Sequence, residues 1–241
     1  MSAISRARDE LLIRALMAAG DRDYVQANKY LIASGFTLPE QGEAARSWCE
    51  ERAKSGYAEA QFVLAKLATV GLFGPEDKPT GLKWCKEAAA RGNLPALMLL
   101  AAYYDGGWGG LEADSLRSLA LIKAAAASDY PPAFCMLGTM YATGNGVPKS
   151  DEQAIVFYRK GAQLGDSAAE FLLGMRLLQS GATATQAEGL DWVMRAAGQD
   201  HASAHSVLAS FYMAGKHGLD KDPARAKLHY ERSAELEGFQ G

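Results

Sequence analysis

Apolar residues along the chain recur at helical spacing, and the whole pattern repeats about every 36 residues. The phrase "WCEERAKSGYAEAQ", which begins at Trp48, returns as "WCKEAAARGNLPAL", which begins at Trp84. The same register continues through Leu121, Phe157, Trp192 and His229. Five residues after each of these positions stands an alanine: Ala53, Ala89, Ala126, Ala162, Ala197 and Ala234. A fixed period of this length predicts a protein built from structural repeats.

Each copy contains two amphipathic helical patterns. The second helix is preceded by a residue that caps helix N-termini well, and these predicted caps are Asp77, Asp114, Ser150, Thr185 and Asp222. The first helix can be indexed from an alanine in each copy: Ala60, Ala96, Ala133, Ala169 and Ala204. Residues three, four, seven and eight positions later are predicted to face the core, as Met136, Leu137, Met140 and Tyr141 do in the third copy. A small residue always stands five positions after the index alanine, which predicts close helix packing: Ala65, Ala101, Gly138, Gly174 and Ala209.

A single helix pair of this size cannot bury its apolar face alone, so successive pairs must stack on one another. The predicted fold is therefore all-α, a right-handed α-solenoid of stacked helix-turn-helix repeats in a single continuous domain. Residues 1–56 are predicted to form an N-terminal helical cap with a degenerate repeat and a lone second helix. The five repeats are predicted at residues 57–92, 93–129, 130–165, 166–200 and 201–241, the last including the C-terminal end.

Composition excludes several classes of protein. With 241 residues, 49% of them hydrophobic, the chain can bury a sizeable core, and its net charge of -3 without a basic run argues against a nucleic-acid surface. No apolar run is as long as a bilayer span, so no membrane insertion is expected. The opening segment carries charges through its apolar part and lacks the core of a signal peptide, which predicts a cytoplasmic protein.

The residues that could carry chemistry do not form a recognisable motif. His201 and His205 are four residues apart, but the phrase "HASAH" lacks the glutamate of zinc proteases, and His201 falls in the turn before a helix. Neither a metal site nor a cofactor is expected. The three cysteines lack metal-type spacing, which predicts reduced thiols, with Cys49 and Cys85 as equivalent packing residues one repeat apart. The sequence therefore predicts that the protein is not an enzyme.

The third copy, "PAFCMLGTMYATGNGVPKSDEQAIVFYRKGAQLGD", resembles the Sel-one-like repeat, a relative of the tetratricopeptide repeat. The resemblance covers roughly residues 57–238 and a lone second helix at 41–55. The fourth copy departs from it by replacing the glycine-rich turn with "SGATATQAEG". The residues that carry the resemblance are Ala133, Leu137, Gly138, Tyr141, Gly144, Gly146, Val147, Asp151, Ala154, Phe157, Tyr158 and Ala162.

Membership of that family implies an adaptor or scaffold that holds other proteins along a concave groove. At 100° per residue, offsets 2, 6 and 9 of each first helix point away from the core stripe, toward the concave side in this repeat class. Those positions carry many apolar residues and only two charges. The predicted partner-binding residues are Phe62, Met98, Phe171, Met175, Leu178 and Met213, with Trp108 in the turn "DGGWGGL" as a secondary contact. The alternative is that tight superhelical curvature buries these positions between neighbouring helices.

The leading functional hypothesis is a protein-protein interaction scaffold whose partner contributes an apolar or amphipathic segment. A second hypothesis is a dedicated neutraliser, such as an immunity protein, or a chaperone of one effector partner. A third is a small hydrolase, since the resemblance extends to secreted family members linked to β-lactams. The chain lacks the paired cysteines of those members, which argues against this third hypothesis.

Overall fold

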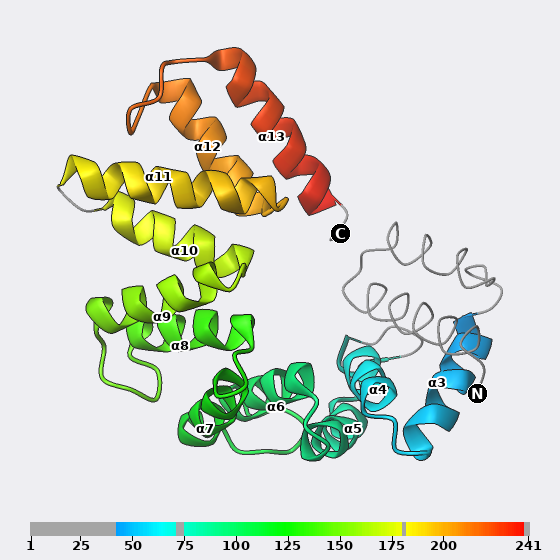
Figure 1. The fold of residues 1–241 in the computed structure, drawn as a ribbon. Coiled ribbons are helices and arrows are strands. Elements are labelled where there is room, and N and C mark those ends of the chain that lie inside the picture. Colours follow the sequence, from blue (N-terminus) through cyan, green and yellow to red (C-terminus); the bar gives the residue numbers. More distant parts are fainter. Residues whose placement is uncertain (1–41, 71–74, 180–181, 239–241) are drawn as a thin grey trace. The chain divides into compact units, whose positions relative to one another are not determined.

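A computed structural model describes residues 42–70, 75–179 and 182–238, and this part of the chain is helical with connecting turns (Figure 1). Residues 1–41 of the predicted N-terminal cap lie outside the described residues. The described helices are α3 (Gly42–Lys54), α4 (Ala58–Val70), α5 (Lys78–Ala90), α6 (Leu94–Gly106), α7 (Ser115–Ala126), α8 (Pro131–Thr143), α9 (Asp151–Gln163), α10 (Ser167–Leu178), α11 (Thr183–Gly198), α12 (Ala202–Ala214) and α13 (Pro223–Gly238). The prediction of an all-α fold of paired helices is confirmed.

The helices belong to two compact units, one up to Ala125 and one from Ala126 onward. Unit 2 contains three antiparallel pairs, α8 with α9, α10 with α11 and α12 with α13 (Figure 1). Within it, α9 packs on α10 and α11 packs on α12, so each second helix contacts the first helix of the next pair. Unit 1 follows the same rule, because α3 packs on α4 and α5 packs on α6.

Four of the five predicted N-caps are confirmed. The Asp77 carboxylate accepts from the Thr80 N–H at 3.0 Å, and Asp114, Ser150 and Asp222 accept equivalent bonds from residues three positions on. The prediction for Thr185 is wrong, since α11 begins at Thr183 with Ala182 at its N-cap. The fourth copy has no glycine or proline immediately before Thr185, and its alanines are strong helix formers, so the helix begins earlier.

The turn between a second helix and the next first helix requires one residue with a positive φ. Gly56, Gly92 and Gly165 supply it at φ of +85°, +80° and +86°. Asp129 and Asp200 occupy the equivalent position at φ of +51° and +59°. Both aspartates pair with a basic residue of the following second helix: Lys160 lies 3.2 Å from Asp129, and Arg232 lies 2.8 Å from Asp200. The aspartates thus replace glycine where an ion pair links neighbouring repeats.

The columns of small residues form the centre of the fold. All five index alanines, from Ala60 to Ala204, are fully buried, and so are the small residues five positions later. Gly138 and Gly174 belong to this second column. A Cβ atom added to Gly138 would lie 2.5 Å from the Tyr158 ring, and one added to Gly174 would lie 2.7 Å from the Gly189 carbonyl oxygen. The predicted close approach of neighbouring helices is confirmed.

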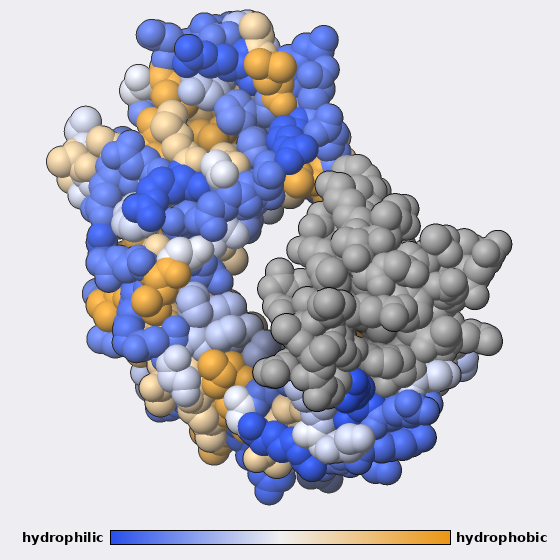
Figure 2. All heavy atoms as spheres, turned by 45° about the vertical axis from the view of Figure 1, so that its right-hand side comes forward, coloured by the Kyte–Doolittle hydropathy of each residue, from blue (hydrophilic) through white to orange (hydrophobic). Residues whose placement is uncertain are grey.

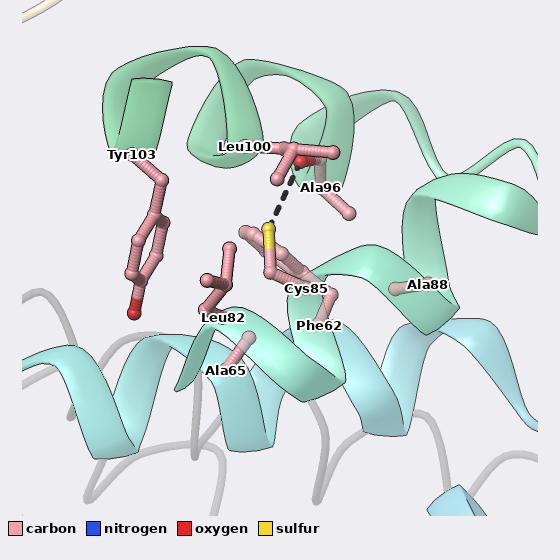
Figure 3. Packing of buried hydrophobic residues seen from close by; sticks show 8 residues of the cluster. All are labelled: Phe62, Ala65, Leu82, Cys85, Ala88, Ala96, Leu100 and Tyr103. Atoms are coloured by element: carbon pink, nitrogen blue, oxygen red, sulfur yellow. Dashed lines mark hydrogen bonds between the residues drawn. The ribbon is translucent and has the colours of Figure 1, made fainter. Parts of the chain in front are cut away.

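The repeated Trp-Cys phrase is explained by packing against the next repeat. The Cys85 thiol donates to the Ala96 carbonyl oxygen at 3.2 Å (Figure 3). Cys49 donates to the Ala60 carbonyl oxygen at 3.4 Å. Both cysteines are free and fully buried. Burial raises the pKa of each thiol to about 12, so neither is a thiolate at neutral pH. Equivalent cysteines in equivalent bonds confirm that both are packing residues.

We expect the melting temperature of the protein to be the same with and without reductant. Cys49, Cys85 and Cys135 are all unpaired, so there is no disulfide to reduce. Differential scanning fluorimetry with and without a phosphine reductant checks this result. A large fall in melting temperature under reducing conditions would contradict the arrangement of free thiols. Cys49→Ser and Cys85→Ser serve as controls, because each should destabilise the protein equally in both buffers.

Candidate functional site

The predicted partner-binding residues do not form one exposed line. Phe62 and Leu178 are only 7% and 6% exposed, so the prediction that they line an open groove is wrong. Phe62 packs with Leu82, Cys85 and Leu100 in a core shared by α4, α5 and α6 (Figure 3). Leu178 belongs to the core that α10 shares with α11 and α12. The alternative interpretation, burial between neighbouring helices, is correct for these two positions, because the next helix pair lies close enough to cover them.

Phe171 and Met175 lie partly in that interface and partly at the surface. Both pack against the core formed with α11 and α12, and the Phe171 ring stacks on His201 with centroids 4.9 Å apart. Each contributes to the joint between consecutive pairs as well as to the surface. Met98 on α6 is partly buried, whereas Met213 on α12 is 43% exposed. Of the six residues, Met213 alone has the exposure that the prediction required.

A different set of positions on unit 2 is uncharged and at least partly exposed. On α8, α10 and α12, offsets 2, 3 and 6 from the index alanine fall within one 100° sector of each helix. All the residues at these positions are partly or fully exposed, and none carries a charge at neutral pH. We call this surface the first-helix face. Its members are Cys135, Met136, Thr139, Phe171, Leu172, Met175, Ser206, Val207 and Ser210.

Met136 is the member that the sequence pattern assigned incorrectly. It stands in the predicted core stripe together with Leu137 and Met140, which are buried as expected. Met136 itself is 42% exposed. Offset 3 lies at the edge of the stripe, and the apolar residues Val63, Leu99, Leu172 and Val207 occupy it in the other copies. The sequence carried no signal that separates an exposed residue from a buried one at this offset.

Trp108 follows α6 and is better packed than its glycine-rich turn suggested. Its ring meets Tyr103 edge to face at 6.0 Å, and the Lys78 ammonium lies 5.2 Å from it. A Cβ atom on Gly106 would come within 2.5 Å of the indole, so this glycine makes room for the ring. Trp108 remains 38% exposed. Trp108 is thus packed on one side and open to solvent on the other.

The histidines do not gather into one site. His201 lies in the turn before α12, as predicted, and its Nδ1 accepts from the Ala204 N–H at 3.3 Å. His205 instead contacts His229 on α13, with the two Nδ1 atoms 2.9 Å apart. In the described ranges, no three His, Cys, Asp or Glu side chains are grouped as metal ligands. The sequence spacing of His201 and His205 therefore does not bring their rings to a common point.

Charged groups of unit 2 cluster on and beside the second helices. Arg159 of α9 pairs with Glu188 of α11, which also accepts from Trp192 Nε1 at 3.2 Å. The hydrogen bond from Arg159 is the main reason that the pKa of Glu188 is lowered. Buried Glu170 of α10 lies 3.1 Å from Arg195 and accepts from the Gln199 amide at 2.7 Å. These pairs join helices within and between repeats and leave the first-helix face uncharged.

The surface view is a mosaic in which separate hydrophobic patches lie among hydrophilic residues (Figure 2). Burial of the Cys135 thiol, which belongs to the first-helix face, raises its pKa to about 12 and makes it a poor nucleophile. Within the described part of the chain, no helix combines the length and apolar composition that crossing a bilayer requires. The one cysteine of the first-helix face is therefore not an activated nucleophile.

Comparison with known proteins identifies the repeat. A model of the Sel1 repeat matches residues 58–93, 94–130, 131–166 and 202–237, and the unmatched interval contains the fourth copy with its altered turn. An uncharacterized protein of Neisseria meningitidis serogroup B, NMB1327, is 32% identical over 114 residues. The match spans 47% of this chain but only 23% of that protein's length.

Two solved structures are similar over most of the chain. A Sel1 repeat protein from Oxalobacter formigenes has a TM-score of 0.74 at 23% identity, covering 92% of this chain and 96% of that one. The immunity protein Pa5087 from Pseudomonas aeruginosa has a TM-score of 0.58 at 26% identity, covering 75% of this chain and 66% of that one. With four matched repeats across more than half of its length, this chain belongs to the Sel1 repeat family.

Proposed function

We propose that the protein is a non-catalytic scaffold that binds another protein through the first-helix face of unit 2. The observation that carries this proposal is the row of uncharged, partly exposed positions on α8, α10 and α12. A solvated helix face normally carries charged residues, and a contiguous apolar surface often marks a binding site. Stacked repeats are also well suited to presenting such a surface to a partner.

The composition of the first-helix face suggests what kind of segment binds there. Met136, Phe171 and Met175 offer flexible and aromatic side chains, and methionine adapts its shape to different partners. Thr139, Ser206 and Ser210 add hydroxyl groups between them. An amphipathic helix or an apolar strand of the partner would fit this surface, whereas an acidic or basic chain end would find no opposite charge on it.

The second candidate function is neutralisation of a single effector by tight binding. It is favoured by the similarity to the immunity protein Pa5087, which has 26% identity and a related fold. A scaffold and a neutraliser would use the same kind of surface but would differ in the number of partners. In both cases we propose a cytoplasmic protein without enzymatic activity. The free, protonated cysteines suit a reducing compartment and do not suit nucleophilic catalysis.

An affinity-capture experiment with the full chain tests the proposed binding surface. The double variant Met136→Glu, Met213→Glu places two charges on or beside the first-helix face, at side chains that are 42% and 43% exposed. The protein should stay folded, and we expect recovery of its specific partners to fall by about tenfold or more. The matched control is Val156→Glu on α9, which adds a charge to a second helix at a position that is also exposed.

Quantitative mass spectrometry of the captured proteins measures both results. Recovery of several partners supports the scaffold, and recovery of essentially one supports the neutraliser. If the double variant captures the same partners as the wild type, the first-helix face is not the binding surface. If Val156→Glu loses them equally, the loss reflects added charge in general, and the assignment fails as well.

A further inference from the structure

The imidazoles of His205 and His229 meet between α12 and α13. Their Nδ1 atoms are 2.9 Å apart, so one ring must donate its Nδ1–H to the bare nitrogen of the other. His205 is buried, and the His229 ring stacks on Tyr212 with an angle of 12° between planes. This bond exists only while the two Nδ1 atoms share a single proton. Protonation of both rings removes the acceptor and places two positive charges in contact.

The charges around the pair come from three elements. Asp200, in the turn before α12, lies 3.8 Å from the Nε2 of His205, and Arg232 of α13 holds that carboxylate by two hydrogen-bonding nitrogens. Arg225 of α13 faces the ring of Tyr212 from 5.6 Å. His201, at the N-cap of α12, has a pKa that is lowered mainly by burial and also by repulsion from His205. Among the groups that face the pair, Asp200 is the acidic one, and its carboxylate is already bound to Arg232. The histidine pair itself can take up a second proton.

Other contacts also attach α13 to α12. Ala226 is fully buried, and the Ser233 hydroxyl donates to the Ala202 carbonyl oxygen at 3.0 Å. Leu228 and Tyr230 of α13 are exposed. The bond between His205 and His229 is one of several contacts between these helices. A change in the charge of these two rings therefore acts directly on the contact between α12 and α13.

We propose that His205 and His229 form a proton-operated latch, which holds α13 on α12 at neutral pH and loosens it when the solution becomes acidic. Loosening would uncover Tyr212 of α12, which is buried in the closed structure and stacks on His229. The latch uses no residue of the proposed partner-binding surface, although His205 and part of that surface both lie on α12.

The pH dependence follows from the direction of the pKa shift. Burial, and then repulsion from His205, lower the pKa of His229 below its usual value of 6.5. The unfolded or opened form therefore binds a proton at a pH where the closed form does not, and stability falls as the pH drops below about 6.5. Burial also lowers the pKa of His201, so acid weakens the N-cap of α12 in the same direction. The experiment must separate these two contributions by position.

Hydrogen-deuterium exchange of the full chain at pH 7.5 and pH 5.0, corrected for the intrinsic exchange rate, makes that separation. We expect protection of the amides of α13 to fall about tenfold more than protection of α9, which has no histidine. His229→Gln keeps a side chain that can hydrogen-bond to His205 but cannot be protonated. In this variant the extra loss in α13 should disappear.

The matched control is His217→Gln, in the turn between α12 and α13, where the ring of His217 packs on Phe211 at 4.6 Å. It removes another histidine without touching the pair, so α13 should respond to acid as in the wild type. His201→Asn keeps an N-cap and removes the other titrating ring, and it should also leave the response of α13 intact. The proposal is overturned if α13 of the wild type keeps its protection at pH 5.0, a result that needs no variant to fold. It is equally overturned if His229→Gln loses protection in acid as the wild type does.

Discussion

Gly174→Ala is expected to lower the free energy of unfolding by about 2–3 kcal/mol, although alanine is the better helix former. The added Cβ would lie 2.7 Å from both the Gly189 carbonyl oxygen and the Val193 Cγ2, and 3.0 Å from the Val193 amide nitrogen. Two of these atoms belong to the backbone of α11, so a rotamer change cannot relieve the contact. A Cβ on Gly189 would meet the Gly174 carbonyl oxygen at 2.9 Å, so the crossing is tight from both sides. The helices α10 and α11 would have to separate.

Urea unfolding followed by circular dichroism measures this change. Gly198→Ala is the matched control, because Gly198 is the last residue of α11 and an added Cβ would have no atom within 4 Å. That variant should be neutral or stabilised by up to about 1 kcal/mol, through reduced entropy of the unfolded chain. Equal effects at the two positions would mean that propensity, and not the helix crossing, governs Gly174.

Ala162→Leu is expected to destabilise the protein by about 1–3 kcal/mol through overpacking. Ala162 on α9 is completely buried in a cluster with Tyr158, Ala169 and Leu173. The cluster includes residues of both α9 and α10, so the larger side chain would push consecutive repeats apart. The larger side chain should weaken the packing between the two repeats more than it weakens the packing within either helix pair.

The same unfolding measurement, with Gln163→Leu as control, checks this prediction. Gln163 is the next residue of α9 and is exposed, so the identical new side chain there should change stability by less than about 0.5 kcal/mol. A neutral result for Ala162→Leu would show that the joint can expand at little cost. The small side chain of Ala162 would then not be what sets the spacing between these repeats.

The sequence alone determined the helix pairs, because each of their signals is local or periodic. The index alanines, the small residues after them and the caps at Asp77, Asp114, Ser150 and Asp222 all lie where the 36-residue register puts them. The equivalence of Cys49 and Cys85 also followed from that register. Thr185 is not the N-cap because the alanines beside it favour helix, so α11 begins two residues earlier, at Thr183.

The tertiary structure decided which residues of the first helices reach the surface. Phe62 and Leu178 are buried and Met136 is exposed, although a helical wheel gives the opposite result for all three. A helical wheel gives the direction in which each side chain leaves its own helix. The exposed fraction of that side chain depends on how closely the next helix pair approaches that side. This distance depends on contacts across repeats, such as Phe171 on His201, which no single repeat specifies.

The pairing of His205 with His229 has the same origin. The two residues are 24 positions apart and lie on different helices, and neither belongs to a local motif. The sequence spacing pointed instead to His201 and His205, whose rings have separate partners in the structure. The sequence by itself determined a stack of helix pairs with an alanine-centred core, because periodic patterns fix local structure and helix faces. Only the tertiary structure decided the exposed surface and the histidine contact, because both depend on distances between residues far apart in the chain.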